Sequence, residues 1–200
     1  MDAVRLIPLI RSDCQLMVLR RVASTNDEAR HRLKAGPPAR TRPLVVISAE
    51  QTAGRGRQGH LWSSPVGGIY LSLLWQSSAR SQQAVSIGLV AAQAVCAAVA
   101  LFTDEPLRIK WPNDVLTPAG KLAGVLVENT DVQGTYIIGI GLNVTPPDDG
   151  GFEGAAYLAN TQVEPLAAAL IDALIERMRR WEQEGCPLIE YGDVQAGHEE

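Results

Sequence analysis

The chain has 200 residues, of which 46% are hydrophobic and 20% are charged, a composition typical of one domain that buries a substantial core. Its formal net charge of -4 and its pI near 5.4 argue against a general nucleic-acid surface, because binding the phosphate backbone requires a basic face. No signal-peptide core precedes Ile10, and Cys14, Cys96 and Cys186 are expected to be reduced packing residues of a cytoplasmic protein.

The first elements predicted along the chain are two strands joined by a helix. Residues 16–20 form a short apolar segment that is expected to be a strand. A capping box from Thr25 to Glu28 then predicts the start of a helix that runs to about Ala35, before a Gly-Pro-Pro stop. Residues 44–49 are expected to be the next strand.

A glycine- and arginine-rich loop, GRGRQGHLW at residues 54–62, follows this strand. Glycine allows close backbone approach, so that successive N–H groups can point at one oxyanion, and arginine adds a permanent planar charge that fits phosphate or carboxylate. The spacing of Gly54, Gly56 and Gly59 also fits a dinucleotide-binding fingerprint, which requires a helix opening on the last glycine. Residues 60–68 contain a proline and two glycines and predict no helix, so we interpret the segment as an anion-binding loop.

The middle of the chain predicts a buried strand and a buried helix. Residues 69–75 read as the strand. The uncharged, alanine-rich segment from Ala84 to Phe102 favours a core helix over a membrane span, because alanine promotes helix formation and inserts poorly into lipid. The face expected to pack on the sheet contains Val85, Leu89, Ala92 and Cys96.

The last predicted elements complete a mixed sheet. Residues 108–111 read as a short strand, and residues 121–129 with 135–142 read as a hairpin. Residues 165–184 read as a closing amphipathic helix, whose apolar stripe contains Leu166, Leu170, Leu174, Met178 and Trp181. The fold class expected is α+β, a mixed β-sheet packed with helices.

Three further segments combine residue types that suit a nucleotide or an anion. In KWPND at 110–114, an amide can read a base edge and a carboxylate can hold Mg²⁺, although a plain turn explains the residues equally well. In KLAGVLVE at 121–128, the lysine is expected to lie near the arginines of the loop at 54–62, where repulsion between like charges is unfavourable unless an anion is bound. The alternative is a solvated lysine at the end of a strand. In GIGLNV at 139–144, the glycines leave room above the sheet, or else mark a tightly packed strand.

These four blocks, in this order, resemble the signature blocks of biotin protein ligases. Ser24-Thr25-Asn26 and Gln51 resemble the two other biotin-side elements of that family, and the resemblance covers residues 20–185. It implies the catalytic-domain fold of biotin and lipoate ligases, which is class II synthetase-like, over residues 1–185, followed by a short tail at 186–200. It also implies a monofunctional member without a DNA-binding domain. The family's small C-terminal β-barrel is not expected, so the chain would be a minimal ligase or a truncation.

The function that the resemblance implies is a two-step acyl transfer. Biotin and MgATP would give biotinyl-5′-AMP and pyrophosphate, and a specific lysine of a biotin carboxyl carrier protein would then accept the biotinyl group. ATP and Mg²⁺ are the implied cofactors, with no nucleic-acid or membrane partner, and family members occur as monomers and as homodimers. Two alternatives remain: a binding module that holds biotin or its adenylate without transfer, and a lipoate–protein ligase.

The resemblance also assigns roles to single residues. The catalytic residues are Lys121, Arg55 and Arg57, which would hold carboxylate and phosphate oxygens. The biotin-binding residues are Ser24, Thr25, Asn26, Gln51, Gly54, Arg55, Tyr70, Lys121, Gly124, Leu126, Gly139 and Ile140, with Tyr70, Leu126 and Ile140 as apolar walls. The ATP-binding residues are Arg57, Gly59, Trp62, Lys110, Asn113 and Asn143, and Asp114 would organise Mg²⁺. His60 stands where the family usually has arginine, so phosphate binding there is expected to be weaker or pH-sensitive.

Overall fold

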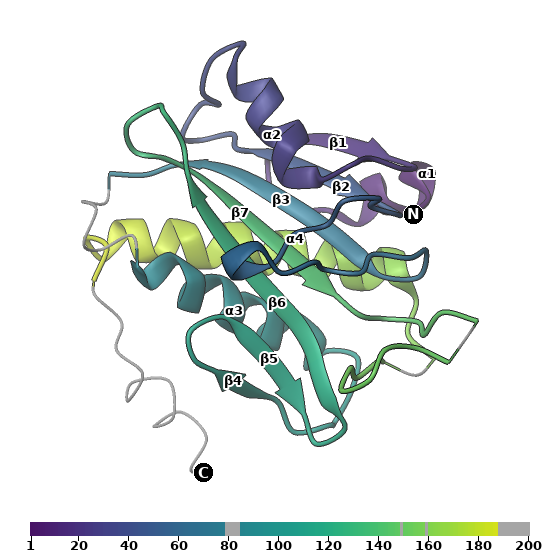
Figure 1. Ribbon diagram of the computed structural model, residues 1–200. Coiled ribbons are helices and arrows are strands. Elements are labelled where there is room, and N and C mark those ends of the chain that lie inside the picture. The colour runs from purple at the N-terminus through teal and green to yellow at the C-terminus, as the bar shows by residue number, and fades with distance from the viewer. Residues whose placement is uncertain (79–84, 149, 159, 188–200) are drawn as a thin grey trace.

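The computed structural model describes residues 1–78, 85–148, 150–158 and 160–187, which form a mixed β-sheet with helices on both faces (Figure 1). Within these residues the sheet has seven strands in the order β1-β2-β3-β7-β6-β5-β4, with β1 and β2 parallel and all other neighbours antiparallel. The strands are β1 Gln15–Leu19, β2 Leu44–Ser48, β3 Ile69–Gln76, β4 Arg108–Lys110, β5 Asp114–Thr117, β6 Gly120–Asn129 and β7 Thr135–Leu142. The helices are α1 Ala3–Leu6, α2 Thr25–Leu33, α3 Ser86–Val99 and α4 Val163–Gln183, with the 3₁₀ helices η1 Ile7–Leu9 and η2 Arg57–Gly59. The predicted α+β class is confirmed.

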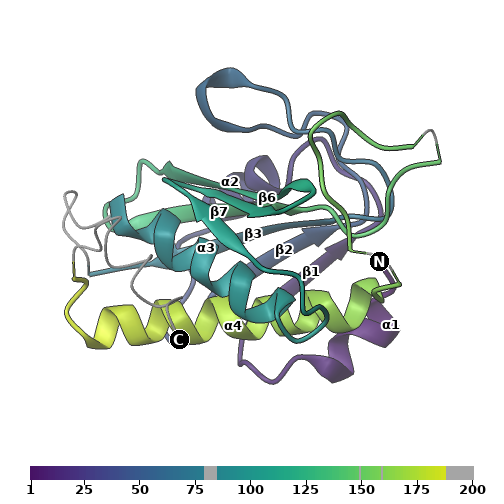
Figure 2. The ribbon, with the colours of Figure 1, turned by 90° about the horizontal axis from the view of Figure 1, so that it is seen from below.

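The main core lies between one face of the sheet and the helices α3 and α4, which run side by side beneath it (Figure 2). Strand side chains alternate between faces, so Leu71 and Leu73 of β3 and Ile138 of β7 point into this core. The predicted stripe of the closing helix is confirmed, because all its members are buried: Leu166, Leu170, Leu174, Met178 and Trp181. No helix within the described ranges is long and apolar enough to cross a bilayer.

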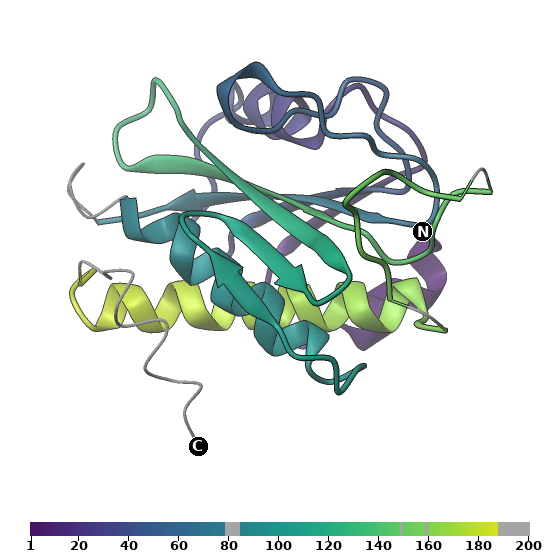
Figure 3. The same cartoon turned by 60° about the horizontal axis from the view of Figure 1, so that its bottom comes forward.

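The opposite face of the sheet is covered by α2 and by the 54–62 loop, which lie on the same side (Figure 3). Under α2 a small apolar cluster joins Ala29 and Leu33 of the helix to Val46, Leu74 and Ile137 of the sheet. This cluster does not extend beneath the loop, where β6 and β7 carry glycines. The face is therefore divided between a packed half and a half available for a ligand.

The predicted capping box at the start of α2 is wrong. Ser24 is the N-cap residue, and its side chain makes no capping hydrogen bond. The N–H and hydroxyl of Thr25 both donate to the side-chain oxygen of Gln51, while the Glu28 carboxylate accepts from Arg32 one turn on. A distant glutamine thus caps the helix, which ends at Leu33 and not at the expected Ala35.

Several other boundaries differ from the sequence-based expectations. The helix expected from Ala84 begins at Ser86, and Ala84 itself lies outside the described residues. Val85 was expected in the core but is 66% exposed, whereas Leu89 and Ala92 are buried as expected.

The strand expected at 108–111 ends at residue 110. The hairpin of β6 and β7 is confirmed, but α1, η1 and β5 were not anticipated, because each has only three or four residues and so shows little periodicity.

Truncation of the α4 stripe is expected to destabilise the protein. Leu170→Ala leaves a cavity between α4 and the sheet and should lower the free energy of unfolding by about 2–5 kcal/mol, measured by urea denaturation. Leu101→Ala is the matched control, because Leu101 is 72% exposed and its truncation should change that free energy by no more than about 0.5 kcal/mol. Equal shifts of the two urea midpoints would contradict this account of the core.

Candidate active site

A cavity of about 280 Å³ lies between the 54–62 loop, the start of α2, and strands β6 and β7. Most residues that the sequence assigned to a site border this cavity. They are Ser24, Thr25, Asn26, Gln51, Arg55, Arg57, Trp62, Asn113, Asp114, Lys121, Gly124, Leu126, Gly139 and Ile140. Segments separated by more than a hundred residues are thus brought to one place.

The floor of the cavity exists because three positions of β6 and β7 lack side chains. Gly124 and Gly141 face each other across the two strands, and Gly139 is two residues along β7. A Cβ atom at Gly141 would overlap the indole of Trp62, and one at Gly139 would overlap the amide of Asn26. The glycines therefore make room for these two larger side chains to rest on the sheet.

The 54–62 loop is a small hairpin. The N–H of Gly56 donates to the carbonyl of His60 at 2.7 Å, and the N–H of Trp62 donates to the carbonyl of Gly54 at 3.0 Å. A Cβ atom at Gly54 would overlap the Trp62 carbonyl and the Ser64 hydroxyl, which explains the need for glycine there. The hairpin places its two arginines at the edge of the cavity.

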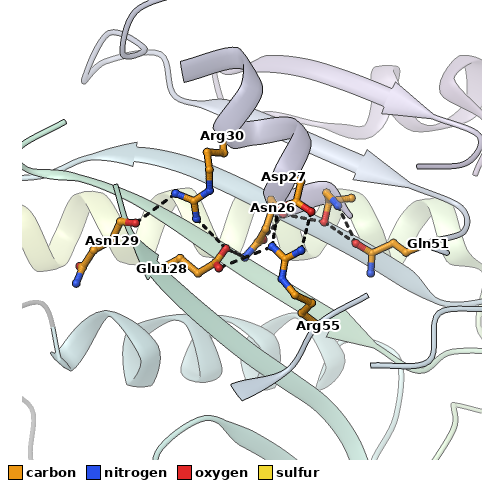
Figure 4. A network of polar contacts seen from close by, with 9 residues as sticks. Asn26, Asp27, Arg30, Gln51, Arg55, Glu128 and Asn129 are labelled. Atoms are coloured by element: carbon orange, nitrogen blue, oxygen red, sulfur yellow. Dashed lines mark hydrogen bonds and ion pairs between the residues drawn. The ribbon is translucent and has the colours of Figure 1, made fainter. Parts of the chain in front are cut away.

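Arg55 is held by two carboxylates (Figure 4). Its guanidinium donates to both oxygens of Asp27, each at 2.6 Å, and Nη2 lies 3.8 Å from an oxygen of Glu128. The hydrogen bonds from Arg55 lower the pKa of the Asp27 carboxyl, and in return raise the pKa of Arg55. Both groups stay charged at neutral pH, and the pair ties the loop to the first turn of α2.

The two other cations of the cavity have fewer charged partners. Arg57 donates through Nη1 to the side-chain oxygen of Asn113 at 3.0 Å, a neutral acceptor. The Nζ atom of Lys121 lies 2.8 Å from Asp114 Oδ1 and 5.2 Å from the centroid of the Trp62 ring. Together with Arg55, these groups place three positive charges around one cavity, an arrangement that suits an anionic ligand.

A group of uncharged polar side chains borders the cavity at the start of α2. The side-chain oxygen of Gln51 accepts from the N–H of Thr25 at 2.8 Å and from its hydroxyl at 3.0 Å. The Gln51 amide nitrogen donates to the Ser64 hydroxyl at 2.9 Å, which fixes the orientation of the amide. Such paired donors and acceptors can read the polar head of a small ligand.

Sequence reasoning missed two polar residues that support this group. The hydroxyl of Ser72 lies within hydrogen-bond distance of Thr25 Oγ1, at 2.8 Å, and of Asn26 Oδ1, at 2.5 Å. Glu128 accepts from Asn26 Nδ2 at 2.7 Å and forms an ion pair with Arg30 at 3.2 Å. The sequence offered two signals for these residues: a serine within an otherwise apolar strand, and a glutamate at the end of the block at 121–128.

Five predicted site residues do not border the cavity: Gly54, Gly59, Tyr70, Lys110 and Asn143. Tyr70 is buried, and its hydroxyl donates to the Pro65 carbonyl at 2.7 Å, so the expected apolar wall is wrong at this position; burial also raises the pKa of Tyr70. Asn143 is also buried and donates its amide to the Lys121 carbonyl at 3.2 Å. Both side chains support the main chain around the site. Gly59 and Lys110 are exposed outside the cavity.

The apolar wall expected from Ile140 is also wrong, because its side chain belongs to the main core under α3 and α4. Strand alternation places that core on the far side of the sheet, so Ile140 borders the cavity through its main chain. Leu126 remains as an apolar residue on the cavity side, beside Gly124 on the same strand. Of the three apolar walls expected, Leu126 alone therefore has its side chain on the cavity side.

Asp114 is the only acidic residue among the described residues that border the cavity, and no group of three or more His, Cys, Asp or Glu side chains in the described part of the chain could hold a metal. A single carboxylate fits Mg²⁺ that arrives with nucleotide phosphates, because Mg²⁺ is commonly bound by one or two carboxylates together with phosphate oxygens. It does not fit a metal site made by the protein alone.

Known proteins share this fold and part of this sequence. The biotin–[acetyl-CoA-carboxylase] ligase of Paracoccus denitrificans is 36% identical over 177 residues, which are 82% of this chain and 72% of that protein. A biotin protein ligase from Aquifex aeolicus, solved in complex with biotin and ATP, has a TM-score of 0.69 at 28% identity, covering 85% of this chain and 72% of that chain. A biotin protein ligase from Leishmania major, in complex with biotinyl-5-AMP, has a TM-score of 0.65 at 27% identity, covering 86% and 78%.

The chain spans about half the length of the curated bifunctional ligase/repressors that it matches. The model of the biotin/lipoate A/B protein ligase family matches residues 18–144, a range that contains the arginine loop, the block at 110–114 and both strands of the cavity floor. The chain therefore belongs to the biotin/lipoate A/B protein ligase family.

Proposed function

We propose that this protein is an ATP-dependent ligase that activates biotin to biotinyl-5′-AMP and transfers the biotinyl group to a lysine of a biotin carboxyl carrier protein. The observation that carries the proposal is one cavity that brings the uncharged polar side chains of Thr25 and Gln51 together with the cations Arg57 and Lys121. Such a cavity matches a molecule with a neutral polar head and a carboxylate tail. Relatives named as biotin ligases, some solved with biotin or its adenylate, support this choice of substrate.

In the first step a carboxylate oxygen of biotin would attack the α-phosphorus of ATP. A new P–O bond forms, the bond from the α-phosphorus to the bridging oxygen breaks, and pyrophosphate leaves. Arg57 and Lys121 would stabilise the negative charge that develops on the phosphate oxygens, since both border the cavity. The reaction needs no nucleophile from the protein, so its rate would depend on positioning and electrostatics.

In the second step the amine of the acceptor lysine would attack the acyl carbon of the adenylate. An amide bond forms, the bond between that carbon and the phosphate oxygen breaks, AMP leaves, and the attacking nitrogen loses a proton. Lys121 would again stabilise the charge on the leaving phosphate. The 54–62 hairpin would limit the access of water to this reactive anhydride.

ATP would bind as MgATP, with the metal as part of the substrate and Asp114 as its protein ligand. We assign Asn113, which accepts a hydrogen bond from Arg57, and the Trp62 ring to the adenine side, because both residues border the cavity. Asn143 would support the adenine side indirectly, because its amide holds the main chain of Lys121. The dependence on ATP and the free cysteines Cys14, Cys96 and Cys186 favour a cytoplasmic location.

Pyrophosphate exchange into ATP tests the first step directly. We expect exchange that requires biotin and is not supported by lipoate. Exchange with lipoate alone would instead identify a lipoate ligase, whereas tight biotin binding without any exchange would identify a binding module. The acceptor step is then measured as incorporation of labelled biotin into a carrier domain.

Loss of the Lys121 ammonium should slow adenylate formation. Lys121→Ala is expected to lower the exchange rate by about 10²–10³-fold, as for other single donors that stabilise a transition state. Lys34→Ala is the matched control, because Lys34 is an exposed lysine at the end of α2 and should leave the rate unchanged. Circular dichroism of both variants should be that of the wild type. An unchanged exchange rate in Lys121→Ala would remove this residue from the mechanism.

A methyl group on the cavity floor should weaken biotin binding. In Gly139→Ala the added Cβ would displace the Asn26 amide, and the loss of about one hydrogen bond should raise KM for biotin about tenfold while KM for ATP stays constant. Gly88→Ala in α3 is the control, since a Cβ there makes only an ordinary contact and alanine favours the helix. Equal KM values for biotin in the two variants would show that Asn26 takes no part in binding.

A further inference from the structure

The 54–62 hairpin reaches the rest of the protein through three side chains. The Trp62 ring lies over Gly124 and Gly141 on the cavity floor. Arg57 donates to Asn113, and Arg55 reaches the opposite side of the cavity to contact α2. The tip between these anchors is exposed from residue 57 to residue 61. The position of the hairpin over the cavity therefore depends on a few side-chain contacts.

Arg55 differs from the other two cations of the cavity in its electrostatic environment. Two carboxylates, from Asp27 and Glu128, face its single positive charge. Lys121 has one carboxylate partner, and Arg57 has a neutral amide. Arg30 also pairs with Glu128, so the charges of this cluster cancel, and both guanidinium hydrogen bonds of Arg55 are already taken by Asp27. Arg55 is therefore the cation of the cavity least free to receive a phosphate or a carboxylate.

Asp27 is well placed to act as a fixed anchor. It belongs to the first turn of α2 and does not border the cavity. The start of this helix is tied to the body of the protein by the bonds from Thr25 to Gln51 and from Asn26 to Glu128 (Figure 4). Both guanidinium hydrogen bonds to Asp27 measure 2.6 Å, a paired geometry that fixes direction as well as distance.

We propose that Asp27, assisted by Glu128, is a positioning residue that holds Arg55 and thereby keeps the 54–62 hairpin over the cavity, so that the activated intermediate is retained. In this role Arg55 acts on the loop and not on the ligand oxygens that the family resemblance assigned to it. We call the contact of Arg55 with Asp27 and Glu128 the clamp. The inference rests on the proposed function only where it concerns the intermediate, because the clamp exists without ligand.

The first test measures the loop in the ligand-free protein. Asp27→Asn keeps the shape of the side chain but removes its charge, and we expect trypsin to cleave the Arg57–Gln58 bond about fivefold faster than in the wild type, followed by mass spectrometry. Glu28→Gln is the matched control, because it removes the neighbouring carboxylate of the same helical turn, whose partner is Arg32 and not the loop. Arg55→Gln breaks the pair from the other side and should accelerate the same cleavage.

Equal cleavage rates in Asp27→Asn, Arg55→Gln and Glu28→Gln would overturn the clamp. The thermal midpoint of each variant is measured in parallel, because faster cleavage that merely follows a lower midpoint would also count against it. Neither readout requires catalytic activity. The clamp can therefore fail or stand independently of the proposed function.

The second test measures retention of the intermediate. Enzyme loaded with labelled biotin and MgATP is chased with unlabelled biotin, and the half-life of the bound adenylate should be about fivefold shorter in Asp27→Asn than in the wild type or Glu28→Gln. Equal half-lives would overturn the retention role. A wild-type protein that forms no adenylate would instead contradict the proposed function, while the cleavage result would still decide whether the clamp exists.

Discussion

Three positions without side chains on β6 and β7 are the constraint on which the site depends. The face of the sheet under α3 and α4 is filled by alternating apolar side chains, and half of the opposite face is filled by the cluster under α2. At Gly124, Gly139 and Gly141 other parts of the chain approach the strands closely on the cavity side. Trp62 and Asn26 can thus rest directly on the strands, and the sheet itself fixes the floor of the cavity.

Each of the three cations around this floor has a protein partner before any ligand arrives. Arg55, Arg57 and Lys121 would repel one another in an empty cavity, and each is held by a protein partner. More than a third of the Lys121 side chain is exposed, and ion pairs at such positions contribute only about 0–1 kcal/mol. A ligand anion can therefore replace Asp114 as the partner of Lys121 at small cost, whereas at Arg55 it would have to displace two paired hydrogen bonds to Asp27, each 2.6 Å long.

The sequence predicted the framework of the site better than its contacts. Long periodic segments such as β7 and α4 were identified, and the four motif blocks were placed on the elements that surround the cavity. Errors arose where a partner distant in the chain decides the outcome. The Thr25 hydroxyl donates to the side chain of Gln51, 26 residues away, and does not cap its own helix. The Asn143 amide donates to the carbonyl of Lys121, 22 residues away, so this amide already has a partner.

The main chain at Lys121 is held much more firmly than its side chain. The Lys121 carbonyl accepts from the amide of Asn143 at 3.2 Å and from the N–H of Ala156 at 2.8 Å, and the Lys121 N–H donates to the Gly154 carbonyl at 2.8 Å. Above this fixed base, four methylene groups carry the ammonium, which can rotate between acceptors without any change in the strand. One cation could thus serve two successive leaving groups, first pyrophosphate and then AMP, while the scaffold beneath it stays still.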